Sequence, residues 1–286
     1  MQLARRGYHV TLAEADNKLG GRVLFESGLK GLSAWKRVSD NRIYEIQQKN
    51  NIEIYKESEL TLSHINELGI KNIFLATGSS WRKDGVGRSR RKPLQGLESL
   101  QVLTPEEAIK QSPNLSGPIV VYDDEQGYLA GVIADHLSFD EHEVIFITPA
   151  SVVSPWTEST LEQKRIQKAL LVSGVNVICN KTIDKAEGSS LNLKCVFTGE
   201  ISLLKCSSLV MVTERIPNTT LYDQLVEQEN NTEQGVAKHI QLIGDAESPG
   251  LIADAVFLGH LAAQSFEEPE QEIQKAMFMR EMPSLK

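Results

Sequence analysis

The sequence is poor in cysteine and contains no cysteine pair at metal-binding spacing. Its 286 residues include three cysteines, Cys179, Cys195 and Cys206, which are widely separated. A zinc site or an iron–sulfur cluster needs closely spaced cysteines, and a secreted disulfide framework usually needs an even number. The sequence therefore indicates neither, and the low cysteine content favours the reducing environment of the cytoplasm.

Long apolar runs and catalytic signatures are also lacking. No run of roughly 18 apolar residues occurs, and the opening residues, MQLARRGYHV, do not have the regions of a signal peptide. There is no Walker loop, no H-E-x-x-H and no G-x-S-x-G. The six histidines do not stand at metal-ligand spacing. We therefore expect no membrane span, no hydrolase and no metal site, and we assign no catalytic residue.

A surplus of positive charge is absent as well. The chain has 38 acidic and 30 basic residues, a net charge of −8, in an ordinary globular composition with 41% hydrophobic residues. Nucleic acids and anionic membranes bind basic surfaces, so neither is an expected partner. The local exception is residues 82–92, RKDGVGRSRRK, which are typical of an exposed loop. That loop is either simply solvated or in contact with an anion or an acidic partner.

What the sequence does contain is an alternation of apolar strands and helices, which predicts an α/β protein with two Rossmann-like lobes. In the first lobe, strands are expected at 8–14, 52–55, 73–76 and from Ile240, with helices at 39–49 and about 249–266. In the second, strands are expected at 118–123, 143–148, 175–179 and 208–213, with helices at about 127–137 and 160–173. The predicted domains are 1–115 plus 215–286, of ADP- or FAD-binding type, and 116–214, of NAD(P)-binding type. The tail, 267–286, is expected to be poorly ordered.

The first lobe is expected to lack its opening strand. A dinucleotide-binding unit places a glycine loop after its first strand and an acidic residue at the tip of the second, roughly 20 residues later. Residues 1–6 are typical of a helix end closed by Gly7, and Glu14 ends the next strand. Counting back from Glu14 passes the first residue. The sequence therefore predicts a first lobe truncated at its N-terminal side, without the first strand and the phosphate loop.

Candidate nucleotide contacts fall where predicted strands end or where glycines permit a close main-chain approach. Glu14 could bind ribose hydroxyls, and Asp245 could either meet a ribitol or pyrophosphate or cap the following helix. A glycine turn followed by Arg22 could bind a phosphate or be an ordinary tight turn. The complete candidate set is Glu14, Gly20, Gly21, Arg22, Ala76, Thr77, Gly78, Gly244, Asp245, Leu251, Ile252 and Ala253.

In the second lobe, acidic residues stand where a glycine loop should be. Strand 118–123 leads into DDEQGYLAG, so Asp123, Asp124 and Glu125 replace small residues. Three carboxylates at this point would repel a pyrophosphate. Only Gly127 and Gly131 remain of the loop. We therefore expect an NAD(P)-binding scaffold without its nucleotide, with a structural or partner-docking role.

Several segments carry a family resemblance: EADNKLGGRV, FLATGSSWR, YDDEQGYLAGVIADHL, TPASVVSPWTESTLEQKRIQ and, most specifically, IQLIGDAESPGLIADAVFLGHLAAQSF. They resemble the C-terminal region of the trimethylamine and dimethylamine dehydrogenase family of NADH:flavin oxidoreductases. Histamine dehydrogenase, N-methylproline demethylase and dienoyl-CoA reductase are similar. The resemblance implies an N-terminal barrel with FMN and the substrate site, then an iron–sulfur cluster, then this ADP- or FAD-binding region. Neither the barrel nor the cluster cysteines are in this sequence.

By the same resemblance, Glu14 would take the adenosine ribose, residues 20–22 would form the nucleotide turn, and residues 76–78 would supply the strand-end contact. Gly244, Asp245 and residues 251–253 would lie on the phosphate side. The parent enzyme would be an amine dehydrogenase or N-demethylase that passes electrons through FMN and the cluster to an electron-transfer flavoprotein.

Two alternatives remain open. The chain could be a stand-alone, non-catalytic nucleotide-binding or docking module, or a small intact NAD(P)H or FAD reductase. The missing phosphate loop and the acids at 123–125 count against the reductase. Oligomer formation is compatible with the sequence, which does not indicate a substrate.

Overall fold

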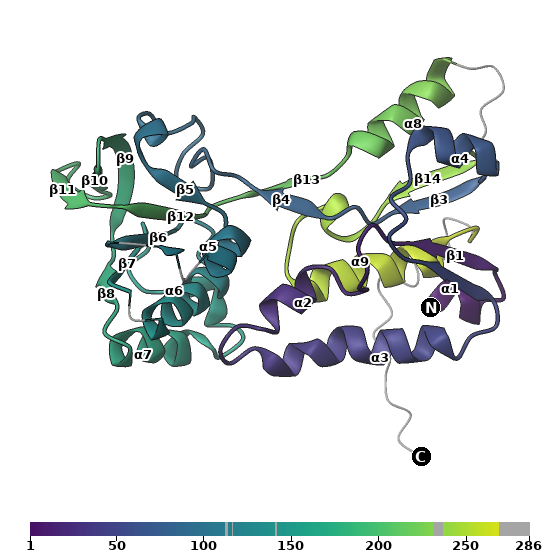
Figure 1. Ribbon diagram of the computed structural model, residues 1–286, viewed down its shortest axis with the longest axis horizontal. Helices are drawn as coiled ribbons and strands as arrows, with labels where there is room; N and C mark the ends of the chain where they lie inside the picture. Colours follow the sequence, from purple (N-terminus) through teal and green to yellow (C-terminus); the bar gives the residue numbers. More distant parts are fainter. Residues whose placement is uncertain (112–113, 116, 141, 232–236, 269–286) are drawn as a thin grey trace. The chain divides into compact units, whose positions relative to one another are not determined.

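The chain folds into two compact units in a computed structural model that describes residues 1–111, 114–115, 117–140, 142–231 and 237–268. The first unit is drawn from residues 1–23, 37–79 and 217–286, and the second from 24–36 and 80–216. Both units combine parallel strands with helices (Figure 1). The α/β fold class expected from the sequence is confirmed.

The second unit is built on a five-stranded parallel sheet. The strand order is β5-β12-β6-β7-β8. In chain order the strands are β5 (Gln101–Leu103), β6 (Ile119–Asp123), β7 (Val144–Ile147), β8 (Asn176–Ile178) and β12 (Ser208–Val212). Every residue of β6, β7 and β12 is buried. Continuous apolar runs become central parallel strands because both faces of such a sheet are covered.

Different layers cover the two faces of this sheet. Ile119 and Val121 of β6 belong to a core shared with the helices, whereas Val120 and Tyr122 belong to a core shared with an antiparallel sheet. The alternation follows from the two-residue period of a strand. The helices are α5 (Pro105–Gln111), α6 (Leu129–Phe139) and α7 (Gln163–Val172), and the antiparallel strands are β9 (Lys181–Glu187), β10 (Ser190–Cys195) and β11 (Ile201–Lys205).

The first unit contains two separate two-stranded parallel sheets. One pairs β1 (Val10–Ala13) with β2 (Ile52–Tyr55), and the other pairs β3 (Asn72–Leu75) with β14 (His239–Leu242). The helices are α1 (Gln2–Arg5), α3 (Lys36–Gln47), α4 (Leu62–Leu68), α8 (Thr220–Asn231) and α9 (Ile252–Ser265). A small core of Ile65, Ile73, Leu75 and Leu225 joins α4 and α8 to β3.

Short elements complete the chain. α2 (Arg22–Glu26) follows the Gly20–Gly21 turn, and β4 (Ser79–Trp81) pairs with β13 (Arg215–Pro217) where the chain passes between the units. The 3-10 turns are Ser33–Trp35, Leu97–Ser99, Pro155–Thr157 and Gly244–Ala246.

The compact units correct the predicted domain boundaries. Residues 80–115 were assigned to the first domain, but β5 is hydrogen-bonded to β12 of the second unit. Leu29 and Leu32 also pack into the second unit's core, so residues 24–36 belong there too. A three-residue strand and two isolated leucines carry almost no periodic signal, and only tertiary burial shows where they belong.

Several predicted elements differ from the structure. No helix was predicted between the strand at 208–213 and the strand from Ile240, but α8 lies there, and β9 was not predicted either. Helix α7 begins at Gln163 rather than 160, because Leu161 adopts a positive φ of 62° in the turn before it. Most of the tail expected to be poorly ordered, residues 269–286, lies outside the described residues.

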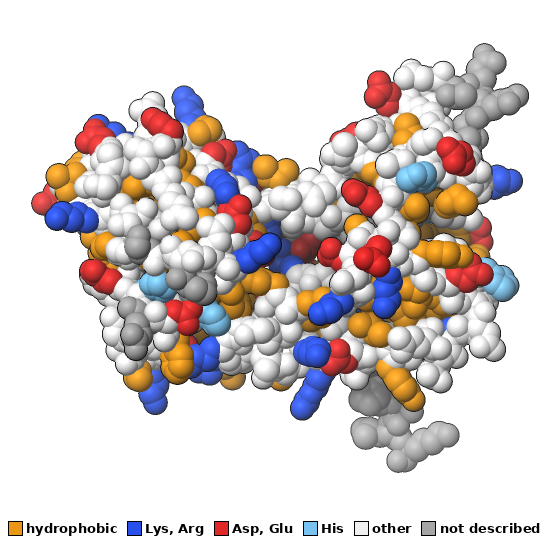
Figure 2. Space-filling view, in the orientation of Figure 1, with side chains coloured by type: hydrophobic (Ala, Val, Ile, Leu, Met, Phe, Trp, Pro, Cys, Tyr) orange, Lys and Arg blue, Asp and Glu red, His pale blue; other side chains and the backbone are white. Residues whose placement is uncertain are grey.

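The surface mixes charges of both signs. On the face shown in Figure 2, Lys and Arg side chains alternate with Asp and Glu side chains, and neither sign forms one continuous region. Among the described residues, no helix combines the length and the apolar character needed to cross a membrane.

Candidate functional site

The best-defined polar cluster of the first unit joins the start of α2 to the segment between β14 and α9. Arg22 Nη2 donates to the carbonyl oxygen of Gly250 at 2.7 Å, and Arg22 Nε lies 3.4 Å from Asp245 Oδ2. Asp245 Oδ1 accepts the N–H of Gly250 at 3.2 Å. Asp245 is only 9% exposed, so this ion pair is well shielded from solvent. Two candidate segments far apart in the sequence, 20–22 and 244–253, are thereby brought together.

Asp245 does not cap helix α9, although a capping role was one of its two predicted roles. The helix begins at Ile252 with Leu251 at the N-cap position, and Asp254 accepts the Leu251 N–H at 2.7 Å. The carboxylate of Asp245 instead closes the turn at Gly250. Leu251 and Ala253 are exposed and Ile252 is buried. The start of α9 is therefore partly exposed.

Residues 76–78 follow β3 at the same end of the sheet as Gly244 and Asp245 follow β14, since Leu75 is in register with Leu242. Gly244 and Gly78 both have positive φ values, 62° and 74°, which favour glycine. The candidate segments 76–78 and 244–245 therefore lie at one carboxyl edge, where ligands of α/β sheets usually bind.

Asn218 makes contacts with residues 77–78 that the sequence did not predict. Its Nδ2 donates to the Thr77 carbonyl at 3.0 Å, its N–H donates to the Gly78 carbonyl at 2.9 Å, and its own carbonyl accepts from Thr77 Oγ1. The segment returning from the second unit thus binds the strand end that we expected to be open to a nucleotide. Asn218 follows Pro217 in a turn-like sequence, but nothing local indicates its partner.

Glu14 lies directly after β1, as predicted. Its N–H donates to the Tyr55 carbonyl at 2.8 Å, which extends the pairing of β1 with β2 by one residue. Its Oε1 accepts the N–H of Asp16 at 3.1 Å. Its carboxylate is positioned at a strand tip, where an acidic residue can accept ribose hydroxyls.

In the second unit, the acidic turn after β6 is folded inward. Asp123 and Asp124 are fully buried. The N–H of Gln126 donates to Asp123 Oδ1 at 2.7 Å, and the N–H of Ser89 donates to Asp124 Oδ2 at 2.9 Å. Burial raises the pKa of Asp123 well above its usual value, opposed by the Gln126 hydrogen bond and reinforced by the neighbouring Glu125 and Asp124. The carboxylates therefore belong to the internal structure of the turn.

Residues 82–92, expected to form an exposed loop, are exposed at positions 83, 88, 89, 91 and 92 but buried in the middle. Gly85, Val86 and Gly87 are buried, and a Cβ at Gly87 would lie 2.4 Å from Asp124 Oδ2. Arg90 Nη2 donates to the carbonyls of Ile183 and Asp184 at 3.1 and 2.7 Å. Arg82 and Lys83 form ion pairs with Asp84 and Glu107 within the chain, whereas Arg91 and Lys92 are exposed.

A family model described as pyridine nucleotide-disulphide oxidoreductase matches residues 1–256. The chain belongs to this family. Its members' fold, with FAD- and NAD(P)-type nucleotide-binding units, agrees with the two α/β units seen here.

Its relatives include longer enzymes. The chain is 27% identical to dimethylamine dehydrogenase from Hyphomicrobium sp. (strain x), with 96% of this chain and 40% of that protein aligned. Histamine dehydrogenase from Rhizobium sp. 4-9 is 38% identical, with a TM-score of 0.90 over 94% of this chain and 42% of that one. The 6-hydroxypseudooxynicotine amine oxidase from Pseudomonas geniculata N1 is 31% identical, with a TM-score of 0.86 over 93% and 40%. The chain thus spans about two fifths of these flavin-dependent amine-oxidising relatives and is homologous to their C-terminal part.

The residues of the first unit fit an adenine nucleotide of the family type. A Cβ at Gly21 would meet nothing within 4 Å, so the main chain of this turn is open to close approach. The 14-residue helix α9 begins at Ile252, next to the Arg22–Asp245 pair, and the N-terminus of a helix favours an anion. Glu14 supplies an acceptor at the end of β1. Arg22 is held by Asp245 and Gly250, so it is positioned before any ligand arrives.

Proposed function

We propose that this chain is the cofactor-binding part of a flavin-dependent oxidoreductase of the amine dehydrogenase or N-demethylase type, and that its first unit binds ADP or the ADP half of FAD. The observation that carries the proposal is the cluster of Arg22, Asp245 and Gly250, which holds the glycine turn beside the start of α9. Glu14 would bind the ribose hydroxyls, and the turn and helix N–H groups would bind the phosphates.

Asp245 would act as a positioning residue in this site. Its two carboxylate oxygens are directed at the Gly250 N–H and the Arg22 guanidinium. Loss of the carboxylate would release both groups and leave the phosphate side of the site without a fixed shape. Residues 76–78 would lie at its margin, with Asn218 holding their main chain.

The second unit would serve as a structural scaffold without a nucleotide. A pyrophosphate loop needs open main-chain N–H groups and no facing carboxylates. Here the turn after β6 carries two buried aspartates, and one of them accepts the Ser89 N–H from the loop 82–92. A dinucleotide would have to displace that loop.

The parent enzyme's chemistry would lie outside this chain. We propose that the amine would be oxidised at FMN in a preceding barrel, and that its electrons would then pass through an iron–sulfur cluster to an electron-transfer flavoprotein. Within the described residues, no group of three or more His, Cys, Asp or Glu side chains could hold a metal ion. The three cysteines are free thiols, which supports a reducing compartment such as the cytoplasm.

Titration with ADP tests the proposed function. Nuclear magnetic resonance of the full chain with up to millimolar ADP detects even a Kd of about 1 mM. We expect saturable shifts at the amides of Gly21 and Ala253, and none at Gly127. A lack of saturable shifts with both ADP and FAD would contradict the proposal. Saturable NAD(P)H binding at Gly127 would instead support the intact-reductase alternative.

A further inference from the structure

The antiparallel sheet of the second unit ends in an edge strand, β11. In the described part of the chain the strand order is β11-β10-β9, so β11 has a neighbour on one side only (Figure 1). Its five residues, ISLLK, contain no proline and no charge before Lys205, and the register shift of this sheet lies elsewhere, between Asn192 and Leu193. Prolines, charges and bulges are the usual means by which an edge strand avoids pairing with another chain, so β11 is poorly protected against such pairing.

The hydrogen bonds to β10 determine which main-chain groups of β11 are open. Cys195 donates its N–H to the Glu200 carbonyl at 2.9 Å, directly before β11 begins. The ladder bonds of an antiparallel pair recur at every second residue, so the even-numbered residues of β11 bond to β10. The odd-numbered residues therefore direct their N–H and carbonyl groups toward the open edge: Ile201, Leu203 and Lys205.

The same strand exposes apolar side chains. Leu203 is 73% exposed and Ile201 is 47% exposed, and Phe197, in the turn between β10 and β11, is also largely exposed. Leu203 and Ile201 share the outer face of the sheet, because Leu204 packs against the core on the inner face and side chains alternate along a strand. Open main-chain groups and exposed apolar side chains therefore coincide on β11.

We infer that β11 is a self-pairing edge, to which a second copy of this chain adds its own β11 in antiparallel orientation about a two-fold axis at Leu203. In this register Leu203 lies opposite the Leu203 of the second copy, and Ile201 lies opposite Lys205. The open N–H and carbonyl groups of all three odd-numbered residues then find partners. The two three-stranded sheets would form one continuous sheet across the axis.

The residue pattern of β11 favours a second copy over an unrelated strand, because a two-fold contact requires a strand that is complementary to itself. Lys205 carries the charge of β11 and lies opposite Ile201, so no like charges face each other. The lysine stem can cover Ile201 while its ammonium group stays in water. An axis at Ser202 would instead place Lys205 opposite Gly199, whose N–H already donates to the Cys195 carbonyl at 3.0 Å.

A dimer held by one pair of strands is weak. A stable interface buries about 1,600 Å² and involves roughly 20–30 residues on each side. One five-residue strand on each side buries much less, so we expect a dissociation constant of about 0.1–1 mM. The contact is therefore a concentration-dependent association of the second unit, and it does not depend on whether ADP binds to the first.

The experiment follows the full chain by sedimentation and by amide hydrogen exchange at protein concentrations up to about 1 mM. We expect a monomer–dimer equilibrium in which the exchange of Ile201, Leu203 and Lys205 slows about twofold or more at the highest concentration. Ser202 and Leu204, which already bond to β10, should change little and serve as internal controls. A chain that stays monomeric, or a dimer that leaves the exchange of β11 unchanged, would overturn the inference.

Charge substitutions at the axis test the register. Leu203→Lys and Leu203→Glu each place two like charges opposite each other, so each variant alone should remain monomeric. A mixture of the two should dimerise, because residue 203 of one copy then meets the opposite charge at residue 203 of the other. Leu171→Lys, at an exposed position of α7, is the matched control and should dimerise like the wild type. The inference fails if Leu203→Lys alone still dimerises, if the mixture stays monomeric, or if Leu171→Lys loses the dimer.

Discussion

The guanidinium of Arg22 lies 3.4 Å from the carboxylate of Asp245, although the two residues come from opposite ends of the sequence. Both side chains are mostly buried, and Gly250 binds each of them, one through its carbonyl and one through its N–H. This relationship sets the shape of the proposed phosphate side before a nucleotide binds. Removing the Arg22–Asp245 ion pair is the most direct test of the site.

Substitution Asp245→Ala should weaken ADP binding about tenfold or more. The change removes the buried carboxylate that Arg22 and the Gly250 N–H both contact, a loss of ~1–3 kcal/mol. Calorimetry with ADP measures it. Glu247→Ala, at an exposed position of the same segment, is the matched control and should bind ADP like the wild type. Equal affinities for Asp245→Ala and wild type would remove Asp245 from the site.

Two glycine-to-alanine substitutions should change stability in opposite directions. At Gly87 a Cβ would lie 2.4 Å from Asp124 Oδ2 and 3.2 Å from Thr213, so Gly87→Ala should lower the free energy of unfolding by ~1–3 kcal/mol. At Gly259, inside α9, a Cβ meets nothing within 4 Å, so Gly259→Ala should raise it by ~0.5–1 kcal/mol. Urea denaturation measures both, and a neutral Gly87→Ala would mean that the loop can move away from Asp124.

The buried carboxyl of Asp123 should make stability fall as pH rises. Burial raises its pKa in the folded state above the unfolded value of about 3.9, so the folded state binds more protons between these two values. The free energy of unfolding should therefore decrease above about pH 4, by at most ~1.4 kcal/mol per pH unit from this group. Asp123→Asn keeps an acceptor for the Gln126 N–H and should flatten the slope between pH 4 and 8. Glu98→Gln, at an exposed site, should not.

Cys195 and Cys206 should differ in reactivity toward alkylating reagents. Hydrogen bonds from Thr198 and from the backbone N–H groups of Thr198 and Phe197 lower the pKa of Cys195 to about 7, whereas burial raises that of Cys206 to about 12. At pH 7.5 iodoacetamide should therefore alkylate Cys195 well before Cys206, as measured by peptide mass spectrometry. Thr198→Val should shift the labelling of Cys195 to higher pH. Thr198→Ser keeps the hydroxyl, so its labelling should follow the pH dependence of the wild type. Equal rates in Thr198→Val and wild type would show that the hydroxyl does not stabilise the thiolate.

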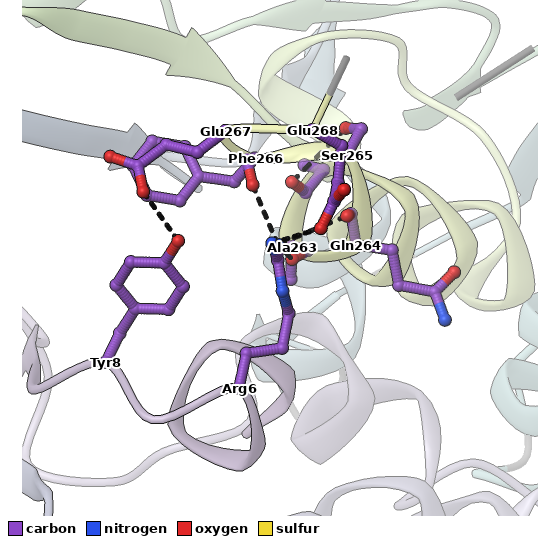
Figure 3. Close-up of polar contacts among 9 residues, drawn as sticks. Arg6, Tyr8, Ala263, Gln264, Ser265, Phe266, Glu267 and Glu268 are labelled. Carbon is purple, nitrogen blue, oxygen red and sulfur yellow. Dashed lines mark hydrogen bonds and ion pairs between the residues drawn. The ribbon is translucent and has the colours of Figure 1, made fainter. Parts of the chain in front are cut away.

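Arg6 should contribute more to stability than its neighbour Arg5. Arg6 donates to the last carbonyls of α9 and also to Glu268 (Figure 3), while Arg5 forms an ion pair with the exposed Glu45. Charge-assisted hydrogen bonds to a helix end are worth ~1–3 kcal/mol, whereas an exposed ion pair is worth ~1 kcal/mol or less. Thermal unfolding of Arg6→Met and Arg5→Met should show the larger loss for Arg6→Met. The reverse order would mean that the end of α9 is held by Phe266 alone.

The central strands of the second unit could be predicted because they are buried on both faces and therefore apolar at every position. The strand ends carrying Glu14 and Asp245 could be predicted for the same reason, since a turn residue follows an apolar run. The short strand β5 could not, because three residues of ordinary composition acquire a strand conformation only by pairing with β12.

By itself, the sequence determined the α/β class, the two lobes, the acidic turn at 123–125 and the family resemblance, because each depends on residue types at local spacing. Only the tertiary structure decided three contacts: Ser89 of the basic loop donates to Asp124, Asn218 donates to the Thr77 carbonyl, and Arg22 pairs with Asp245. It also decided that β1 and β3 belong to different two-stranded sheets in the described part of the chain. These are relations between distant segments, which arise when burial brings the segments together and their polar groups must find partners.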